Sequence, residues 1–148
     1  MQLWRVSRHR DLNGTGGLTV SGRWHSLGHL VIYTSEHQGT AQLEWLAHLD
    51  VASPADFPLT VPFSEILVDG AASRSEVRRE DLPAEWESDE GITQRIGDDW
   101  LDSVRSLLLF VPSVLVPARN VLVNPLHSDA IRMRIVRSFD FPLDARLS

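Results

Sequence analysis

The sequence predicts one mixed α/β domain, richer in strand than in helix. Its 148 residues suit a single domain spanning 1–148. Short apolar segments rich in β-branched residues alternate with turns containing Gly, Pro, Asn and Ser. Few segments show apolar residues at helical spacing. These observations favour a sheet of mostly antiparallel strands covered by a few helices.

The first half of the chain shows strand patterns and one helix pattern. Residues 2–6 alternate and predict a short strand, and the glycine-rich segment 13–17 predicts a loop that tolerates positive φ. Residues 29–34 predict a stronger strand, and 37–49 a helix that follows it. Residues 59–67 predict the next strand, entered through a proline.

The second half begins with a polar stretch, 69–90, which we expect to be a connecting loop or irregular insertion. Residues 98–103 predict a helix. Several apolar segments follow, and the last of them alternates with arginines in a half-buried pattern. The strands predicted here are 106–111, 114–116, 121–123 and 131–138.

Composition excludes several classes of protein. The chain has no Cys, so it has neither disulfides nor a thiolate nucleophile. Its six His residues show no zinc-ligand spacing, and we expect no metal site. The net charge of −6 argues against nucleic-acid binding. We find no signal peptide and no membrane-spanning segment, and therefore expect a soluble cytoplasmic protein. All basic side chains are Arg, so an anion site would use guanidinium groups, backbone N–H groups or helix N-termini.

Three polar residues are candidates for chemistry. Arg23 lies in a predicted loop, Tyr33 ends a predicted strand, and Glu44 lies between Leu43 and Trp45 on the predicted helix. A carboxylate among large apolar side chains is costly to bury unless it is paired or functional. Each residue also has an ordinary structural interpretation: an ion-pair arginine, a core tyrosine and a glutamate on the helix surface.

Polar residues at strand ends form a second group of candidates. Ser113 follows an apolar strand and could bind a phosphate or a ribose hydroxyl, or simply hydrogen-bond within a turn. Asn124 and His127 lie in an Asn-Pro segment, which first indicates a turn. No Gly-x-Ser-x-Gly motif is present, which argues against an α/β-hydrolase.

Taken in order, these segments resemble the RES-domain family along nearly the whole chain. The resemblance rests on an ordered series of segments, each weak by itself. They are Gly22-Arg23-Trp24, Val31-Ile32-Tyr33, the Glu44 helix, Gln94–Leu101, Val111-Pro112-Ser113, Asn120–His127 and the terminal Asp144-Ala145-Arg146-Leu147. Two residues depart from the family pattern: His25 stands where Asn is usual, and Leu27 where Pro is usual.

The resemblance implies an ADP-ribosyltransferase-like fold and NAD as substrate, with inorganic phosphate as a possible co-substrate and no bound cofactor. The family's Arg, Glu and Ser correspond to Arg23, Glu44 and Ser113, with Arg5 as a second arginine. Glu44 would stabilise the oxocarbenium-like transition state. Arg23, assisted by Arg5, would hold a phosphate. Tyr33 would shape the nicotinamide pocket. Ser113 would bind a phosphate or ribose hydroxyl, and we add as binding residues Trp24, Asn124 and His127.

The family also implies a function in the cell. We expect the toxin of a type II toxin–antitoxin system that acts as an NAD phosphorylase or glycohydrolase, partnered by an Xre-type helix-turn-helix antitoxin. Three alternatives stay open at this point. They are an ADP-ribosyltransferase acting on a host protein, a nucleotide-binding module without turnover, and a purely structural or interaction protein.

Overall fold

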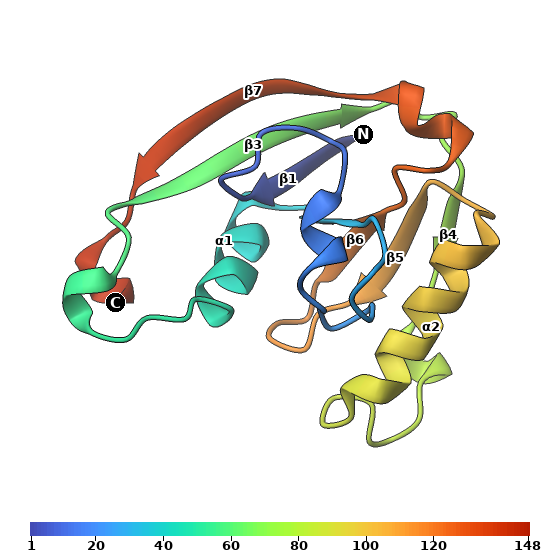
Figure 1. The fold of residues 1–148 in the computed structure, drawn as a ribbon, viewed down its shortest axis with the longest axis horizontal. Coiled ribbons are helices and arrows are strands. Elements are labelled where there is room, and N and C mark those ends of the chain that lie inside the picture. The colour runs from blue at the N-terminus through green and yellow to red at the C-terminus, as the bar shows by residue number, and fades with distance from the viewer.

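The computed structural model describes residues 1–148 as one strongly curved seven-stranded sheet with two α-helices (Figure 1). The strand order is β4-β5-β6-β2-β1-β3-β7, and every neighbouring pair is antiparallel except β4 and β5. This confirms the predicted mixed α/β fold of mostly antiparallel strands. The elements are β1 (Gln2–Val6), β2 (Ile32–Ser35), α1 (Gln38–Ala47), β3 (Thr60–Val68), β4 (Arg74–Glu76), α2 (Glu90–Ser103), β5 (Leu108–Pro112), β6 (Arg119–Val123) and β7 (Met133–Pro142).

The curvature of the sheet encloses the largest apolar cluster. In Figure 1 the long strands β3 and β7 arch over the molecule, whereas β5 and β6 run steeply away beneath them. Leu3 and Ile66 come from the arched part, and Leu108 and Val121 come from the steep part. All four belong to one buried cluster and have no exposed surface. Burial of this apolar area between the two parts of the sheet supplies the main driving force for the fold.

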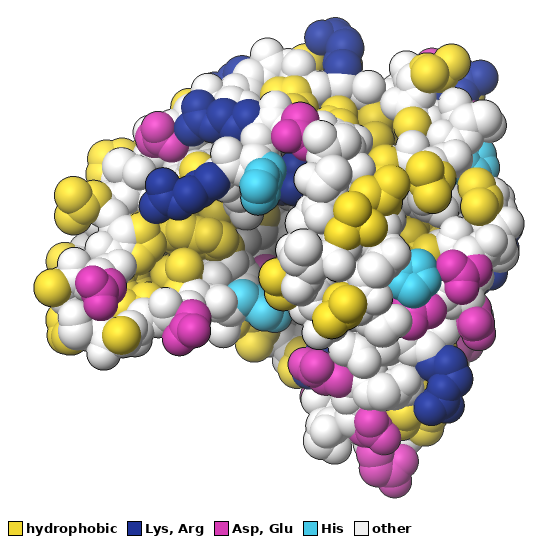
Figure 2. Space-filling view, viewed as in Figure 1, with side chains coloured by type: hydrophobic (Ala, Val, Ile, Leu, Met, Phe, Trp, Pro, Cys, Tyr) yellow, Lys and Arg dark blue, Asp and Glu magenta, His cyan; other side chains and the backbone are white.

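Both α-helices cover the other face of the sheet. Residues directly opposite one another on paired strands point to the same face, and the register joins Trp4 to Ser35, Ser35 to Asn120 and Asn120 to Val111. Trp4 packs with Ala41 of α1, and Val111 belongs to the cluster that contains Trp100 of α2. Apolar side chains also fill the hollow between α1 and the arch (Figure 2). Polar side chains on this face therefore lie between two helices.

Helix α2 begins much earlier than the predicted 98–103, at Glu90. The Asp89 side chain caps it by accepting a hydrogen bond from the backbone N–H of Gly91. The helix presses closely on the segment that precedes β2: a Cβ at Gly97 would lie 1.5 Å from the carbonyl oxygen of Trp24. Only glycine permits this approach.

Three further predictions were wrong in detail. Residues 114–116 form a turn, not a strand, because their backbone curls around the hydroxyl of Ser113. The strand predicted from 131 begins at Met133, and Ile131 is 92% exposed within a preceding 3-10 helix. The insertion 69–90 contains β4, which extends the sheet beside β5.

Candidate functional site

Glu44 lies on α1 with its carboxylate facing the ends of two strands. One oxygen, Oε1, accepts a hydrogen bond from the Ser113 hydroxyl at 2.6 Å and another from Nδ2 of Asn120 at 2.8 Å. Ser113 follows β5 directly, and Asn120 lies in β6. Three elements thus hold one carboxylate, and both donors are on the same oxygen. The other oxygen, Oε2, has no hydrogen bond within the protein.

Ser113 is fixed by its own backbone turn. The backbone N–H groups of Leu115 and Val116 both donate to the Ser113 hydroxyl oxygen, at 3.0 Å and 3.3 Å. With its lone pairs accepting these bonds, the hydroxyl directs its single proton to Glu44. The residue is 1% exposed, so this orientation is set by the fold and not by solvent. The structure places the predicted Glu44 and Ser113 in direct contact.

Asn120 is a site residue that we did not predict. Its side-chain oxygen accepts a hydrogen bond from the buried hydroxyl of Ser35 at 2.7 Å. No local pattern marks either residue, because each looks like an ordinary polar residue at a strand terminus. Only the pairing of β2 with β6, which places Ser35 opposite Asn120, brings them to the carboxylate.

Arg23 lies beside the N-terminus of α2 and has 22% of its side chain exposed. Its Nη1 donates to the carbonyl oxygens of Trp86 and Glu87, both at 3.2 Å. Its Nη2 is 3.9 Å from the carboxylate of Glu90, the first residue of α2. The guanidinium is thus tied to the segment before the helix, with Nη2 more loosely held than Nη1.

Contacts through Arg79 connect Arg23 with Glu44. The guanidinium of Arg79 donates to the carbonyl oxygen of Ser113 and lies 5.3 Å from the ring centroid of Trp86. The backbone carbonyl oxygen of Trp86 in turn accepts a hydrogen bond from Arg23, and the Ser113 hydroxyl donates one to Glu44. The predicted arginine and carboxylate therefore belong to one contact network on the face that carries both helices.

Trp24, next to Arg23, and Tyr33 of β2 hold the loop that carries Arg23. The Tyr33 hydroxyl accepts from the backbone N–H of Trp24 at 3.1 Å and lies 2.7 Å from Nδ1 of His25. Burial raises the pKa of the Tyr33 phenol and lowers the pKa of His25. Trp24 is 2% exposed and packs on Trp86. The tyrosine hydroxyl is thus occupied within the protein.

Arg5, Asn124 and His127 are not brought together with Glu44. Arg5 alternates with Trp4 on β1, so it points to the face opposite the helices, where it donates to the carbonyl oxygen of Asp11. Burial lowers its pKa. Asn124 and His127 follow the far end of β6, and each accepts a hydrogen bond from a backbone N–H of the following turn. Nδ2 of Asn124 also donates to the carbonyl oxygen of Leu101 in α2. These contacts fit structural roles.

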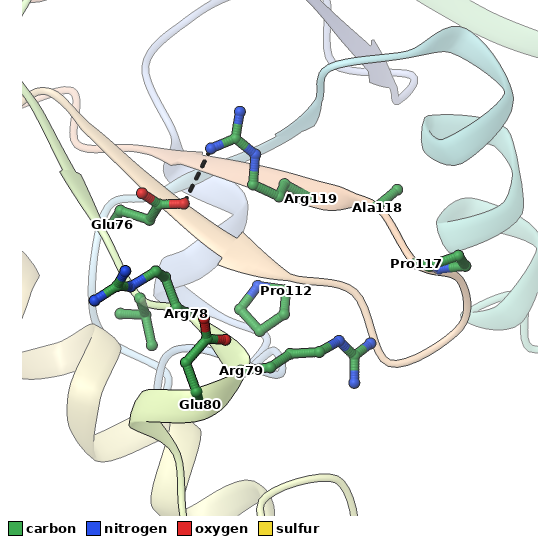
Figure 3. A pocket seen from close by; sticks show the side chains of 9 residues that line it. Glu76, Arg78, Arg79, Glu80, Pro112, Pro117, Ala118 and Arg119 are labelled. Carbon is green, nitrogen blue, oxygen red and sulfur yellow. Dashed lines mark hydrogen bonds and ion pairs between the residues drawn. The ribbon is translucent and has the colours of Figure 1, made fainter.

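A cavity of about 400 Å³ adjoins the Ser113 turn (Figure 3). Its lining includes Arg78, Arg79, Pro112 and Arg119, and Arg79 also contacts the Ser113 carbonyl. Arg119 is held by ion pairs to Glu36 at 2.8 Å and Glu76 at 3.1 Å. Neither Glu44 nor Arg23 lines this cavity.

The structure has no group of three or more His, Asp or Glu side chains arranged as metal ligands. Neither α-helix has the length and apolar character needed to cross a membrane.

Comparison with known proteins identifies the family. The family model described as the RES domain matches residues 2–144. The chain belongs to the RES domain family. The fold is similar to that of a solved structure as well: a chain of the Mycobacterium tuberculosis MbcT–MbcA toxin–antitoxin complex superposes with a TM-score of 0.73, at 19% identity, over 95% of this chain and 84% of that one.

Curated relatives of this RES domain match it over almost their full length. "Toxin Res" of Pseudomonas putida is 40% identical over 148 residues, covering 99% of each chain. "Toxin Res" of Yersinia enterocolitica is 35% identical over 159 residues, again covering 99% of each chain. A protein of Sphingobium named "Prs ADP-ribosylating toxin" is 35% identical and covers 92% of this chain and 91% of its own.

Proposed function

We propose that this RES domain is the toxin of a toxin–antitoxin pair and that it degrades NAD by cleaving the nicotinamide–ribose bond. The observation that carries the proposal is the carboxylate of Glu44. It is fixed by Ser113 and Asn120 and connected through Arg79 and Trp86 to Arg23. This arrangement supplies one oriented negative charge for the reacting ribose and one cationic group for a phosphate.

The chemistry follows from where charge develops. When the bond between nicotinamide and ribose breaks, the bonding electrons leave with nicotinamide and positive charge builds on the ribose. An oriented carboxylate beside that carbon stabilises the transition state more than the ground state. Water or inorganic phosphate then forms the new bond to the ribose carbon. Glu44 is the residue we assign to this role, with Oε2 facing the ribose.

The binding role falls to the arginine beside α2. A guanidinium can donate two parallel hydrogen bonds to a phosphate, which Lys cannot match. Nη2 of Arg23 has only a 3.9 Å contact to Glu90 and lies beside the first turn of α2. We assign the pyrophosphate of NAD to this end of the site.

The partner that we propose is an antitoxin of the Xre type. Support comes from the fold shared with a chain of a toxin–antitoxin complex and from relatives named as toxins. Copurification of the natively expressed chain with a second, helix-turn-helix protein would support this partner, and isolation of the chain alone would argue against it.

A second candidate function is transfer of ADP-ribose to a protein. The observation that favours it is the name of the Sphingobium relative, an ADP-ribosylating toxin. The same carboxylate would serve either reaction, because the two differ only in the acceptor that attacks the ribose carbon.

Product analysis by mass spectrometry tests both functions. The purified chain is incubated with NAD, with and without inorganic phosphate, and with a cell extract as a source of protein acceptors. We expect nicotinamide release with ADP-ribose or its 1″-phosphate as the second product. A protein that carries ADP-ribose, without free ADP-ribose or its 1″-phosphate, would select the transfer reaction. Intact NAD under all conditions would contradict the proposal.

A further inference from the structure

Ser35 makes no hydrogen bond to Arg23 or Glu44, but it is hydrogen-bonded to the residue that holds Glu44. It ends β2, is 2% exposed, and its hydroxyl donates to Oδ1 of Asn120 at 2.7 Å. Asn120 in turn donates through Nδ2 to Oε1 of Glu44 at 2.8 Å. Ser35, Asn120 and Glu44 are thus joined by two successive hydrogen bonds, from the end of β2 to the carboxylate.

The chemistry of the donors and acceptors allows only one orientation of the Asn120 amide. A carboxylate can only accept hydrogen bonds, so the amide must present its NH₂ group to Glu44. Its carbonyl oxygen then faces Ser35, whose hydroxyl has one proton and can donate it. The reversed amide would set its oxygen against the carboxylate oxygen, which is repulsive.

We propose that Ser35 is a positioning residue for the carboxylate of Glu44, acting through Asn120. The inference rests on the proposed function, because it concerns how the catalytic carboxylate is held. Without the Ser35 hydroxyl, Oδ1 of Asn120 loses its donor and the amide is no longer held with Nδ2 toward Glu44. Glu44 Oε1 then depends on Ser113 alone, and Oε2 is less well oriented toward the ribose.

The kinetic test combines two substitutions. Removing one such hydrogen bond should lower kcat of Ser35→Ala by about 5- to 10-fold, with KM for NAD changed less than about 2-fold, since binding groups are untouched. Ser35→Thr keeps a hydroxyl and should restore kcat. Because Ser35 acts only through Asn120, adding Ser35→Ala to Asn120→Ala should cause no further loss.

A matched control is available in β4. Ser75 also hydrogen-bonds through its hydroxyl to another side chain, Ser106 at 2.8 Å, away from Glu44. Ser75→Ala should keep the kcat of the parent protein. Parental kcat in Ser35→Ala would overturn the proposal, as would losses that simply multiply in the double variant.

A measurement without substrate separates this inference from the proposed function. In a ¹⁵N NMR spectrum the side-chain NH₂ group of Asn120, identified by its absence in Asn120→Ala, reports its own hydrogen bonds. We expect Ser35→Ala and Glu44→Gln each to shift this pair of signals, and Ser75→Ala to leave it in place. An unmoved Asn120 signal in Ser35→Ala would refute the positioning role even if NAD is cleaved, and a shift would support it even if NAD is not.

Discussion

A single carboxylate oxygen with two donors is the feature on which the chemistry depends. Glu44 Oε1 accepts from Ser113, which directly follows β5, and from Asn120 in the next strand, β6. Each donor is itself held, the serine by backbone N–H groups and the asparagine by Ser35. Hydrogen bonds to a charged acceptor are the stronger kind, so the carboxylate is oriented before any substrate arrives.

Glu44→Gln should keep the fold and lose turnover. The neutral side chain retains an oxygen that can accept from Ser113, so the packing of α1 is preserved. It lacks the negative charge that stabilises the transition state, and kcat should fall by about 10²- to 10³-fold. Initial rates of nicotinamide release, with circular dichroism as the check on folding, measure this. Undiminished kcat in a folded variant would remove the mechanism.

Arg23→Lys should weaken binding more than turnover. Lysine retains the charge but loses the planar fork that can bind a phosphate through two hydrogen bonds. We expect KM for NAD to rise about tenfold, with kcat changed much less. Steady-state kinetics separates the two parameters. A variant with reduced kcat and parental KM would place Arg23 at the reacting carbon instead of the pyrophosphate.

Two histidines in the Arg23 loop should respond to pH in opposite directions. Hydrogen bonding to the Ser26 carbonyl, with Asp98 and Asp102 nearby, raises the pKa of His29, whereas burial lowers the pKa of His25. A raised pKa adds stability that is full below the unfolded pKa of about 6.5 and is lost as pH rises through the folded pKa. A lowered pKa does the reverse, because folding then opposes protonation.

His29→Gln should therefore make the protein more sensitive to acid. The variant loses the group that stabilises the fold at low pH and keeps His25, which destabilises it there. Thermal unfolding measured between about pH 8 and about pH 5.5 should show a steeper fall of Tm on acidification than in the parent protein. Parallel Tm curves for the two proteins would contradict the assigned direction of the His29 shift.

At the scale of elements, the docking of α2 depends on a glycine. A Cβ at Gly97 would lie 1.5 Å from the Trp24 carbonyl oxygen, whereas one at Gly39 of α1 would have no atom within 4 Å. Gly97→Ala should therefore separate α2 from the Arg23 loop and destabilise the fold by about 3 kcal/mol or more. Gly39→Ala, the matched control, should be neutral or slightly stabilising. Thermal unfolding of both variants tests this. Equal Tm values for Gly97→Ala and Gly39→Ala would contradict the close contact between Gly97 and the Trp24 carbonyl.

Sequence patterns predicted the elements better than they predicted the site. Strands β2 and β3 and helix α1 follow from local periodicity, because each buries one face or lies wholly in the core. Residues 114–116 looked like a strand, yet the hydrogen bonds from their N–H groups to Ser113 turn the chain. The pattern over 98–103 predicts only the last part of helix α2, because its first turns, from the Asp89 cap onward, lie in a polar stretch. Ser35 and Asn120 could not be found from sequence, because only strand register brings them together.

At the scale of the whole molecule, a series of contacts links the two predicted ends of the site. Arg23 precedes β2 and Glu44 follows it, and the connection between them runs through Arg79 and Trp86, which come from the insertion 69–90. This insertion looked like a mere connecting loop, but it joins the Ser113 turn to the α2 side of the site. Residues distant from it, such as Asn124 at the other end of β6, were predicted from their place at a strand end and make hydrogen bonds within the protein.

The most direct test of the account is nicotinamide release from NAD by the parent protein and by Glu44→Gln, purified free of any antitoxin and compared at equal folded concentration. The account predicts rapid release by the parent protein and near loss of release by the variant, with both unfolding at similar temperatures. Equal release by both proteins, or none by the parent, would contradict it.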